Sequence, residues 1–438
     1  MQKEKKLSTE PYKGTRDFYP EDFAQLHYLI GTMSKVAERF GYVEYSASVL
    51  EPAELYRAKS GEEIVNEQTY TFTDRGDREV TLRPEMTPTV ARMIAGKRRE
   101  LPYPLRWYSI PNIFRYEQPQ RGRLREHWQL NVDLFGAPGV EADLEVITLA
   151  VHILKEFGAK EKDYEVRIND RRLSSALFEH MGFDTPIIQK IFKLADKKDK
   201  MRADVFEGAL VELVGENAAQ LTALWSAKDT AEAVAALPSS LQKHPVIASV
   251  EEILLGLAAL GIGNAVFKPS LARGFDYYTG TVFEIFDTNP ENRRSIFGGG
   301  RYDNLLEIFG EQSVPAVGWA MGDVTIRDFL EIRGLLPSYR SPIDLYICRV
   351  EGVSPDFVNQ TAEKLRSDGL NVAVDFGERK VGTQIEAAAK QKIPFIVCLG
   401  PDEMKTERVK VKELESGTET EMSVEDISPS IKARRREK

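Results

Sequence analysis

Residues 113–136, IFRYEQPQRGRLREHWQLNVDLFG, form two strand-like runs on either side of an arginine-rich turn. Successive side chains of a strand point to opposite faces, so Arg115 and Glu117 share one face of the first run. The second run has a polar face, which consists of Arg125, His127, Gln129, Asn131 and Asp133. Its other face is apolar and consists of Trp128, Leu130, Val132 and Leu134. This pattern predicts a strand with one face on a core, whose polar face lies either in solvent or in a polar pocket.

The arginines of this stretch favour the pocket. Arg115, Arg121 and Arg123 are placed to hold a polyphosphate, because a guanidinium binds phosphate oxygens in pairs whereas a lysine acts as a point charge. The whole chain has 59 basic and 68 acidic residues, and this net charge of −9 taken alone argues against a nucleic-acid partner. Residues 86–130, however, carry nine basic and three acidic residues, a local excess of +6. The sequence therefore predicts an anion site within an acidic protein.

The 438 residues are enough for two to three domains. Apolar residues at helical spacing predict helices near 21–40, 87–97 and 140–157, and a helical insertion at 173–260. The stretch from 42 to 135 is otherwise typical of short strands and turns. Strand character returns at 272–286, and we expect the glycines at 298–300 to end it. These elements make up a predicted first domain, residues 1–333.

Strands alternate with helices after residue 341, which predicts βαβ units and a mainly parallel sheet in a second domain, residues 341–438. Glycine, proline and serine mark residues 333–341 as the linker. The basic tail, residues 432–438, is predicted to be a solvated end.

Several classes of protein and site are excluded or disfavoured. The chain has no run of about 18 apolar residues and no apolar core of a signal peptide near its start, so we expect a cytoplasmic protein without a membrane partner. Cys348 and Cys398 lie in apolar runs and are expected to be buried free thiols rather than metal ligands. The sequence has neither a GxxxxGK[ST] loop nor a GxGxxG loop that opens a helix, so a nucleotide site must be built differently.

The stretch 113–136 resembles motif 2 of class II aminoacyl-tRNA synthetases, and in detail that of the histidyl-tRNA synthetases. Further segments resemble the same family in the same order: YKGTRDFYPED (12–22), LRPEMTPTVAR (82–92), LARGFDYYTGTVFE (271–284), FGGGRYDNLLE (297–307), AVGWAMG (316–322) and ERKVGTQIEAAAKQKIPFIVCLG (378–400). The resemblance implies an α+β catalytic domain, with an antiparallel sheet flanked by helices and a helical insertion. It also implies a C-terminal α/β anticodon-binding domain.

The resemblance implies an ATP site. Arg115 would hold the α-phosphate, Glu117 the adenine side and Arg123 the outer phosphates, and His127 stands where relatives stack an aromatic ring on adenine. Arg273 would stabilise the charge that develops at the α-phosphate, so Arg115 and Arg273 are the implied catalytic residues. Magnesium would bridge the phosphates, held mainly by ATP oxygens and a few carboxylates rather than by a dedicated protein site.

The resemblance also implies a histidine pocket. Glu85, Thr87 and Gln129 would receive the α-ammonium group, and Asp133, Tyr278 and Tyr302 would surround the imidazole. Other interpretations stay open at this point: Glu85 and Thr87 also suit the cap of the helix that starts near Thr87, Tyr302 also suits packing, and Tyr277 is expected in the core.

The chain departs from the family pattern at three places. Ser48 replaces the proline of motif 1, which lies at the dimer interface of relatives, and His127 replaces the usual phenylalanine. In motif 3, Thr325 stands where an arginine is expected against the ATP phosphates. Arg327 lies two residues later, and we hypothesise that it substitutes. Side chains two positions apart lie on the same face of a strand but about 200° apart around a helix. Arg327 can therefore replace an arginine at position 325 only if the strand is longer or the start of the helix is shifted.

The resemblance implies a histidine–tRNA ligase that uses ATP, histidine and tRNA(His), and a homodimer. The alternative is a catalytically impaired histidine-sensing regulatory protein on the same fold, which the motif 3 departure favours. For tRNA contact in the second domain the candidates are Arg379, Lys380 and Gln384, since a basic pair precedes a helix whose N-terminus suits phosphate. A solvated basic turn is the competing interpretation.

Overall fold

The computed structural model describes residues 7–57, 68–198, 201–227, 229–272, 277–292, 295–377 and 379–436. The chain divides into two compact units, Met1–Pro337 and Ser338–Lys438. The division falls between residues 337 and 338, inside the segment predicted as the linker.

The first unit is built on a mixed sheet in the order β1-β5-β7-β12-β11-β10-β8-β9, with β6 also paired to β7. The strands are β1 (Val43–Glu44), β5 (Leu105–Ser109), β6 (Asn112–Phe114), β7 (Glu126–Phe135), β8 (Tyr164–Asp170), β9 (Ala265–Phe267), β10 (Thr281–Asp287), β11 (Ser295–Arg301) and β12 (Ala316–Gly322). The pairs β1·β5 and β8·β9 are parallel, and the other pairs are antiparallel. The expected α+β fold is confirmed, although two of the strand pairs are parallel in a sheet that was expected to be antiparallel.

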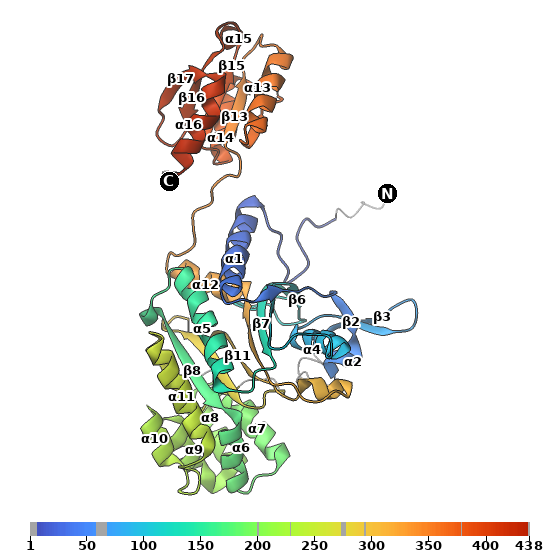
Figure 1. Cartoon of the computed structure of the whole chain (residues 1–438), viewed down its shortest axis with the longest axis vertical. Coiled ribbons are helices and arrows are strands. Elements are labelled where there is room, and N and C mark those ends of the chain that lie inside the picture. The colour runs from blue at the N-terminus through green and yellow to red at the C-terminus, as the bar shows by residue number, and fades with distance from the viewer. Residues whose placement is uncertain are drawn as a thin grey trace, which may run out of the picture. The chain divides into compact units, whose positions relative to one another are not determined.

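Helices cover one face of this sheet (Figure 1). They are α1 (Pro20–Arg39), α5 (Val140–Glu156) and α12 (Asp323–Ile332). Leu130, Val132 and Leu134 of β7 are buried in the core that these helices close. The predicted apolar face of β7 is therefore confirmed, and its polar face points to the opposite side of the sheet.

A smaller three-stranded sheet lies with the helices α2 and α4 beside β6 and β7 (Figure 1). They are β2 (Leu50–Pro52), β3 (Tyr70–Thr73), β4 (Glu79–Leu82), α2 (Ala53–Arg57) and α4 (Thr87–Lys97). The helix α4 begins and ends where the sequence predicts it. Its N-cap residue is Met86, which makes no side-chain cap hydrogen bond.

In the described residues between β8 and β9, six helices form a lobe of the first unit (Figure 1). They are α6 (Arg171–His180), α7 (Thr185–Ala195), α8 (Ala203–Val214), α9 (Ala218–Trp225), α10 (Thr230–Ala236) and α11 (Pro245–Ala259). Asp170, Asp184 and Asp229 cap three of these helices with their carboxylates. The lobe has a hydrophobic core of its own, to which Ile191, Leu221 and other buried residues belong. Short 3-10 turns are η1 (Glu161–Asp163), η3 (Gly215–Asn217) and η4 (Leu305–Phe309).

Two strand predictions were wrong in their limits. The strand expected at 272–286 begins only at Thr281 in the described residues, and the glycine cluster at 298–300 does not end a strand but lies inside β11. The reason for the glycines is a close approach of two backbones. A Cβ on Gly299 would lie 2.0 Å from the carbonyl oxygen of Gly318 on β12, a distance that no side chain tolerates.

The second unit has a five-stranded sheet in the order β14-β13-β15-β16-β17, with β13, β14 and β15 parallel and the last two pairs antiparallel. Its elements are β13 (Leu345–Arg349), α13 (Pro355–Ser367), β14 (Val372–Val374), α14 (Val381–Lys390), β15 (Phe395–Leu399), α15 (Pro401–Thr406), β16 (Arg408–Glu413), β17 (Glu419–Ser423) and α16 (Val424–Arg436). Residues 432–436 of the basic tail belong to α16, whose Ile427 and Ile431 are buried in the core. None of the described helices is long and apolar enough to cross a membrane.

A buried ion pair joins β11 to α5. The Arg301 guanidinium donates to Asp143 over 2.6 Å and also to the carbonyl oxygens of Ala137 and Gly139, and both charged side chains are at most 6% exposed. We expect Arg301→Leu to lower the free energy of unfolding by about 3–5 kcal/mol, because it leaves the Asp143 carboxylate buried without its partner. Urea denaturation measures this loss. The double variant Arg301→Leu/Asp143→Leu should recover much of it, and equal losses in the single and double variants would contradict the explanation.

Candidate active site

Two adjoining cavities lie on the polar side of the main sheet. The larger has a volume of about 590 Å³ and the smaller about 110 Å³. Arg115, Gln129, Gly298 and Ala320 line both cavities, so a ligand in one can reach a ligand in the other. The polar face of β7 therefore belongs to a pocket, which decides between the two interpretations that the sequence left open.

The turn between β6 and β7 supplies one wall of the larger cavity. Arg115 follows β6 directly, and its Nε donates to the carbonyl oxygen of Pro84 over 2.8 Å. Arg123 Nη1 lies 3.4 Å from Glu117 Oε2, and Arg115 Nη1 lies 3.9 Å from Glu117 Oε1. Glu117 thus sits between two guanidinium groups, and all three side chains line the cavity.

His127 lines the larger cavity from the start of β7. Burial, together with the nearby charges of Arg115 and Arg16, lowers the pKa of His127 to about 3. The imidazole is therefore neutral at any physiological pH, and its ring is available as a flat, uncharged surface beside the guanidinium groups. The histidine at this position therefore adds no positive charge to the cavity.

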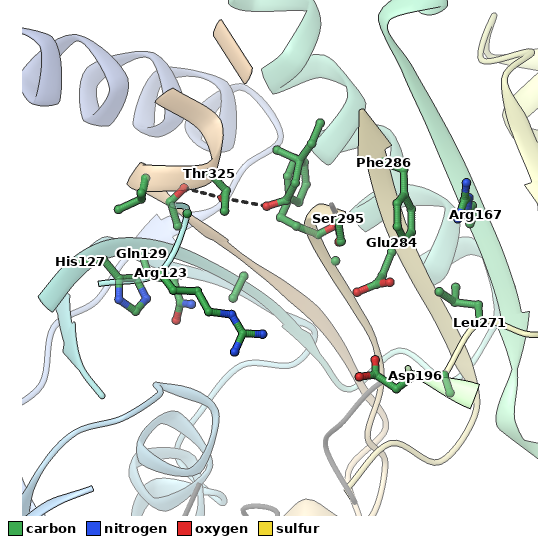
Figure 2. A pocket seen from close by; sticks show the side chains of 18 of the residues that line it. Arg123, His127, Gln129, Arg167, Asp196, Leu271, Glu284, Phe286, Ser295 and Thr325 are labelled. Carbon is green, nitrogen blue, oxygen red and sulfur yellow. Dashed lines mark hydrogen bonds between the residues drawn. The ribbon is translucent and has the colours of Figure 1, made fainter. Parts of the chain in front are cut away.

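The start of α12 places Thr325 and Arg327 on different sides of the helix. Thr325 lines the larger cavity, and its hydroxyl donates to the carbonyl oxygen of Ile296 over 2.8 Å (Figure 2). Arg327 is not among the described residues that line the cavity, and its Nη2 lies 3.8 Å from Asp22 Oδ1 on α1. Since β12 ends at Gly322 and α12 begins at Asp323, the condition for Arg327 to replace the missing arginine is not met.

The wall opposite Arg123 and His127 comes from the other half of the sheet (Figure 2). Arg167 of β8 stacks on the ring of Phe286 of β10, with the guanidinium carbon 3.9 Å from the ring centroid. The other charged residues of this wall are Glu284, Lys268, Asp196 and Lys198. The sequence prediction missed this wall because its members are distant in the chain and belong to no common motif.

The smaller cavity is lined by five of the six residues predicted to bind histidine. These are Glu85, Thr87, Gln129, Tyr278 and Tyr302. The alternative role of Glu85 and Thr87 as a helix cap has no support, because Met86 is the N-cap of α4. Tyr277, expected in the core, is buried but also lines this cavity, and its hydroxyl donates to Glu85 Oε2 over 3.2 Å.

Asp133, the sixth residue, is fully buried next to the smaller cavity. Its Oδ1 accepts a hydrogen bond from the Tyr302 hydroxyl, and Gly318 permits this contact because a Cβ there would lie 2.8 Å from that hydroxyl. Asp133 Oδ2 is buried and has no hydrogen-bond partner within the described part of the chain. Burial raises the pKa of Asp133 to about 7. An acceptor of this kind suits a ligand that brings its own N–H donor.

Two predicted positions lie elsewhere. Arg273 lies outside the described residues, which stop at residue 272 and resume at 277. Ser48 is exposed between β1 and β2, where its hydroxyl accepts from the backbone N–H of Leu50 over 3.2 Å.

The three tRNA candidates of the second unit differ in exposure. Gln384 is 1% exposed, and its amide bonds to the backbone of Arg349 and Arg379, so it is a structural residue and its prediction as an RNA contact was wrong. Arg379 and Lys380 are exposed at the N-terminus of α14, where Arg379 pairs with Asp375. Phe376 is 76% exposed beside them, and its signal in the sequence was an aromatic residue within a polar, glycine-containing loop.

The donor set of the larger cavity fits magnesium bound chiefly by phosphate oxygens. Glu284 and Asp196 line the cavity, yet the described residues contain no group of three or more His, Cys, Asp or Glu side chains that could hold a metal ion. One or two carboxylates with substrate phosphates are the usual ligands of Mg²⁺.

Comparisons with known proteins agree with this geometry. The family model for histidyl-tRNA synthetase matches residues 14–325, and that for an anticodon-binding domain matches residues 345–434. The chain is 41% identical to the histidine–tRNA ligase of Leptospira biflexa over 433 residues, 98% of this chain and 99% of that one. It is 36% identical to the histidine–tRNA ligase of Thermoplasma volcanium over 97% of this chain and 99% of that one. The solved histidyl-tRNA synthetase from Nostoc sp. PCC 7120 has the same fold, with a TM-score of 0.81 at 24% identity over 98% of this chain and 100% of that one.

Proposed function

Because the chain belongs to the histidyl-tRNA synthetase family, we propose that it is a histidine–tRNA ligase. It activates histidine with ATP to histidyl-adenylate and pyrophosphate, and then transfers the histidyl group to the 3′ end of tRNA(His). The observation that carries the proposal is the pair of adjoining cavities that share Arg115 and Gln129. One is basic and large enough for a nucleotide, and the other lies next to the buried Asp133 Oδ2, which has no hydrogen-bond donor among the described residues.

In the activation step a carboxylate oxygen of histidine attacks the α-phosphorus of ATP, and the bond to the bridging oxygen breaks to release pyrophosphate. Arg115 lies where the cavities meet, so we assign it to the α-phosphate, and Arg273 is assigned there by resemblance alone. Arg123 holds outer phosphates, Glu117 takes the adenine side and the neutral His127 ring stacks on adenine. Magnesium, when bound, supplies further charge neutralisation on the phosphates. The protein contributes position and electrostatic stabilisation rather than a nucleophile.

In the smaller cavity Asp133 Oδ2 accepts the imidazole N–H, and the Tyr302 hydroxyl holds Asp133 in place. Tyr278 packs beside the ring, while Glu85, Thr87 and Gln129 receive the α-ammonium group. A pocket of matched polar groups selects histidine because an analogue without the ring nitrogens leaves those groups unpaired.

Histidine-dependent exchange of labelled pyrophosphate into ATP tests this function. We expect exchange with histidine and magnesium and none with other amino acids. No exchange under these conditions would reject the ligase and revive the histidine-sensing alternative, which the comparisons with known proteins do not favour.

The same proposal includes a homodimer in the cytoplasm. Support for the dimer comes from exposed apolar side chains near motif 1, since Val43, Leu50 and Phe72 are between 44% and 64% exposed on β1, β2 and β3. Sedimentation at micromolar protein concentration measures the oligomeric state, and a monomer would contradict the proposed homodimer.

For tRNA we assign contacts to Phe376, Arg379 and Lys380 at the N-terminus of α14, where an exposed ring beside basic groups suits a stacked base and its phosphate. We expect Phe376→Ala to raise the KM for tRNA about tenfold, in line with roughly 1–3 kcal/mol per stacked base, and Phe376→Tyr to leave it nearly unchanged. Pyrophosphate exchange, which needs no tRNA, should be the same in all three proteins. An unchanged KM in Phe376→Ala would remove this residue from the interface.

A further inference from the structure

We infer that residues 12–15 form an N-terminal clamp, which holds the motif 2 turn (residues 117–123) in the form that binds ATP. Arg125 is the positioning residue through which the clamp acts. The inference rests on the proposed function, because it concerns ATP in the larger cavity. It gives a role to the segment YKGTRDFYPED and to the first arginine on the polar face of the second strand-like run, neither of which contributes a side chain assigned to a ligand.

Arg125 lies between the motif 2 turn and β7 and holds the turn from outside the site. The residue is 9% exposed, and it is not among the described residues that line either cavity. Its Nε donates to the carbonyl oxygen of Glu117 over 3.1 Å, and its own carbonyl oxygen accepts from the backbone N–H of Arg115 over 2.9 Å. Since Glu117 and Arg115 both line the larger cavity, Arg125 fixes the backbone of two residues assigned to ATP.

The N-terminal clamp holds Arg125 in turn. The backbone N–H of Arg125 donates to the carbonyl oxygen of Gly14 over 2.7 Å, and its Nη1 donates to the Tyr12 hydroxyl over 3.0 Å. The guanidinium carbon lies 4.0 Å from the ring centroid of Tyr116 and 5.5 Å from that of Tyr12. The clamp is itself a turn, in which the Thr15 hydroxyl donates to the carbonyl oxygen of Tyr12 over 2.7 Å. These contacts limit the guanidinium to one orientation.

Gly14 allows the clamp to approach the motif 2 turn closely. Its φ is +87°, a conformation that favours glycine. A Cβ at this position would lie 2.8 Å from Arg125 Cγ and 2.9 Å from Pro119 Cγ. Because Pro119 belongs to the turn itself, a side chain at residue 14 would push both the turn and Arg125 away from the clamp.

The tip of the motif 2 turn follows its base. Gln120 and Arg123 bond to each other through their backbones, over 3.0 Å and 2.9 Å, so the tip is a small closed loop. Arg123 reaches from it into the larger cavity, where its Nη1 lies 3.4 Å from Glu117 Oε2. A displacement of about 1 Å in a group that orients a substrate can cost about a hundredfold in rate. The clamp therefore acts on the groups assigned to the outer phosphates and the adenine.

We expect Gly14→Ala to raise the KM for ATP in pyrophosphate exchange about tenfold, because the added Cβ displaces the motif 2 turn. The KM for histidine should change less than twofold, since none of the described residues that line the smaller cavity belongs to the clamp or to the turn. Gly41→Ala is the matched control: Gly41 also has a positive φ, +79°, but no atom lies within 4 Å of its Cβ position. The control has the same backbone strain without the contact.

Trypsin measures the position of the turn independently of the reaction. Arg121 and Arg123 are 65% and 52% exposed, and cleavage after them should be about tenfold faster in Gly14→Ala and in Tyr12→Ala than in wild type, as for the loss of a hydrogen bond to a charged group. Tyr12→Phe keeps the ring but loses the acceptor for Arg125, so its rate should be intermediate. Tyr12→Ala added to Arg125→Ala should raise the KM for ATP no further, because the clamp acts through Arg125.

Cleavage and calorimetric binding of ATP separate this inference from the proposed function. Wild-type protein without histidine-dependent exchange would refute the ligase, while faster cleavage and weaker ATP binding in Gly14→Ala would still support the clamp. The inference is overturned by unchanged cleavage in both Gly14→Ala and Tyr12→Ala, or by faster cleavage with unchanged ATP binding. It is also overturned by an equal rise of the KM for ATP in Gly41→Ala, or by a KM for histidine that rises in parallel with the KM for ATP.

Discussion

Replacement of Asp133 by asparagine is expected to lower kcat/KM for histidine in pyrophosphate exchange by about a thousandfold, equivalent to roughly 4 kcal/mol. Asp133 Oδ2 is a buried acceptor that lacks a donor in the described chain, so the imidazole N–H is its natural partner. An asparagine in the same orientation presents an N–H₂ group to that imidazole N–H, and two donors repel. The KM for ATP should change little, because Asp133 does not line the larger cavity.

The same substitution should make the free protein more stable at pH 8. Burial raises the pKa of Asp133 to about 7 from an ordinary value of 3.8, so the folded state holds this proton more tightly than the unfolded state does. That contribution to stability is fully present below about pH 4 and is lost as the pH rises to 7. Three pH units correspond to about 4 kcal/mol, as an order of magnitude. Asparagine remains neutral and still accepts from Tyr302, so the variant does not lose this stability.

Urea denaturation at pH 5 and pH 8, without histidine, measures the difference. The free energy of unfolding of Asp133→Asn should exceed that of wild type by a larger amount at pH 8 than at pH 5. Tyr302→Phe is the control: it keeps the carboxylate but removes the donor to Asp133, and it should therefore be less stable than wild type at pH 8. A variant Asp133→Asn that is less stable than wild type at both pH values would refute the raised pKa as its cause.

The faces of β7 were predictable because alternation along one strand is a local property. Leu130, Val132 and Leu134 lie in the core, and Gln129 lines both cavities on the other side. Arg167 was not predictable in the same way, since its place opposite Arg123 depends on the register of β8, β10, β11 and β12, and β8 lies more than 100 residues before its partner β10 in the chain. Long-range register is invisible in a local pattern.

Errors at Arg327 and Gln384 have a different origin. The side on which Arg327 lies depends on whether the chain is strand or helix after Gly322. A shift of the helix start by two residues would reverse the outcome for Arg327. Gln384 was chosen from its position next to a basic pair, but burial on the inner face of α14 commits its amide to the backbone of Arg349 and Arg379. Proximity in sequence to a charged pair does not predict exposure on a helix, because neighbours there are about 100° apart.

The second large effect is expected for Arg115→Ala, which should reduce the rate constant of adenylation by about 10²–10³-fold, as for the loss of a preorganised donor to a developing charge. Arg115 lines both cavities, and its Nε donates to the carbonyl oxygen of Pro84, which holds the guanidinium where the cavities meet. The effect should fall mainly on the single-turnover rate of adenylate formation, because a group that binds the α-phosphate more strongly in the transition state raises kcat rather than ground-state affinity.

Two variants locate this effect. Arg115→Lys keeps the charge but loses the paired donors, so we expect a rate between those of wild type and Arg115→Ala. Arg106→Ala is the matched control, since Arg106 is also a partly buried arginine of this sheet, pairs with Glu145 and is not one of the described residues lining either cavity. If Arg106→Ala slowed adenylation as much as Arg115→Ala, the loss would reflect the stability of the sheet. If Arg115→Ala raised only the KM for ATP, Arg115 would be a ground-state contact, and the charge on the α-phosphate would have to be stabilised from elsewhere in the site.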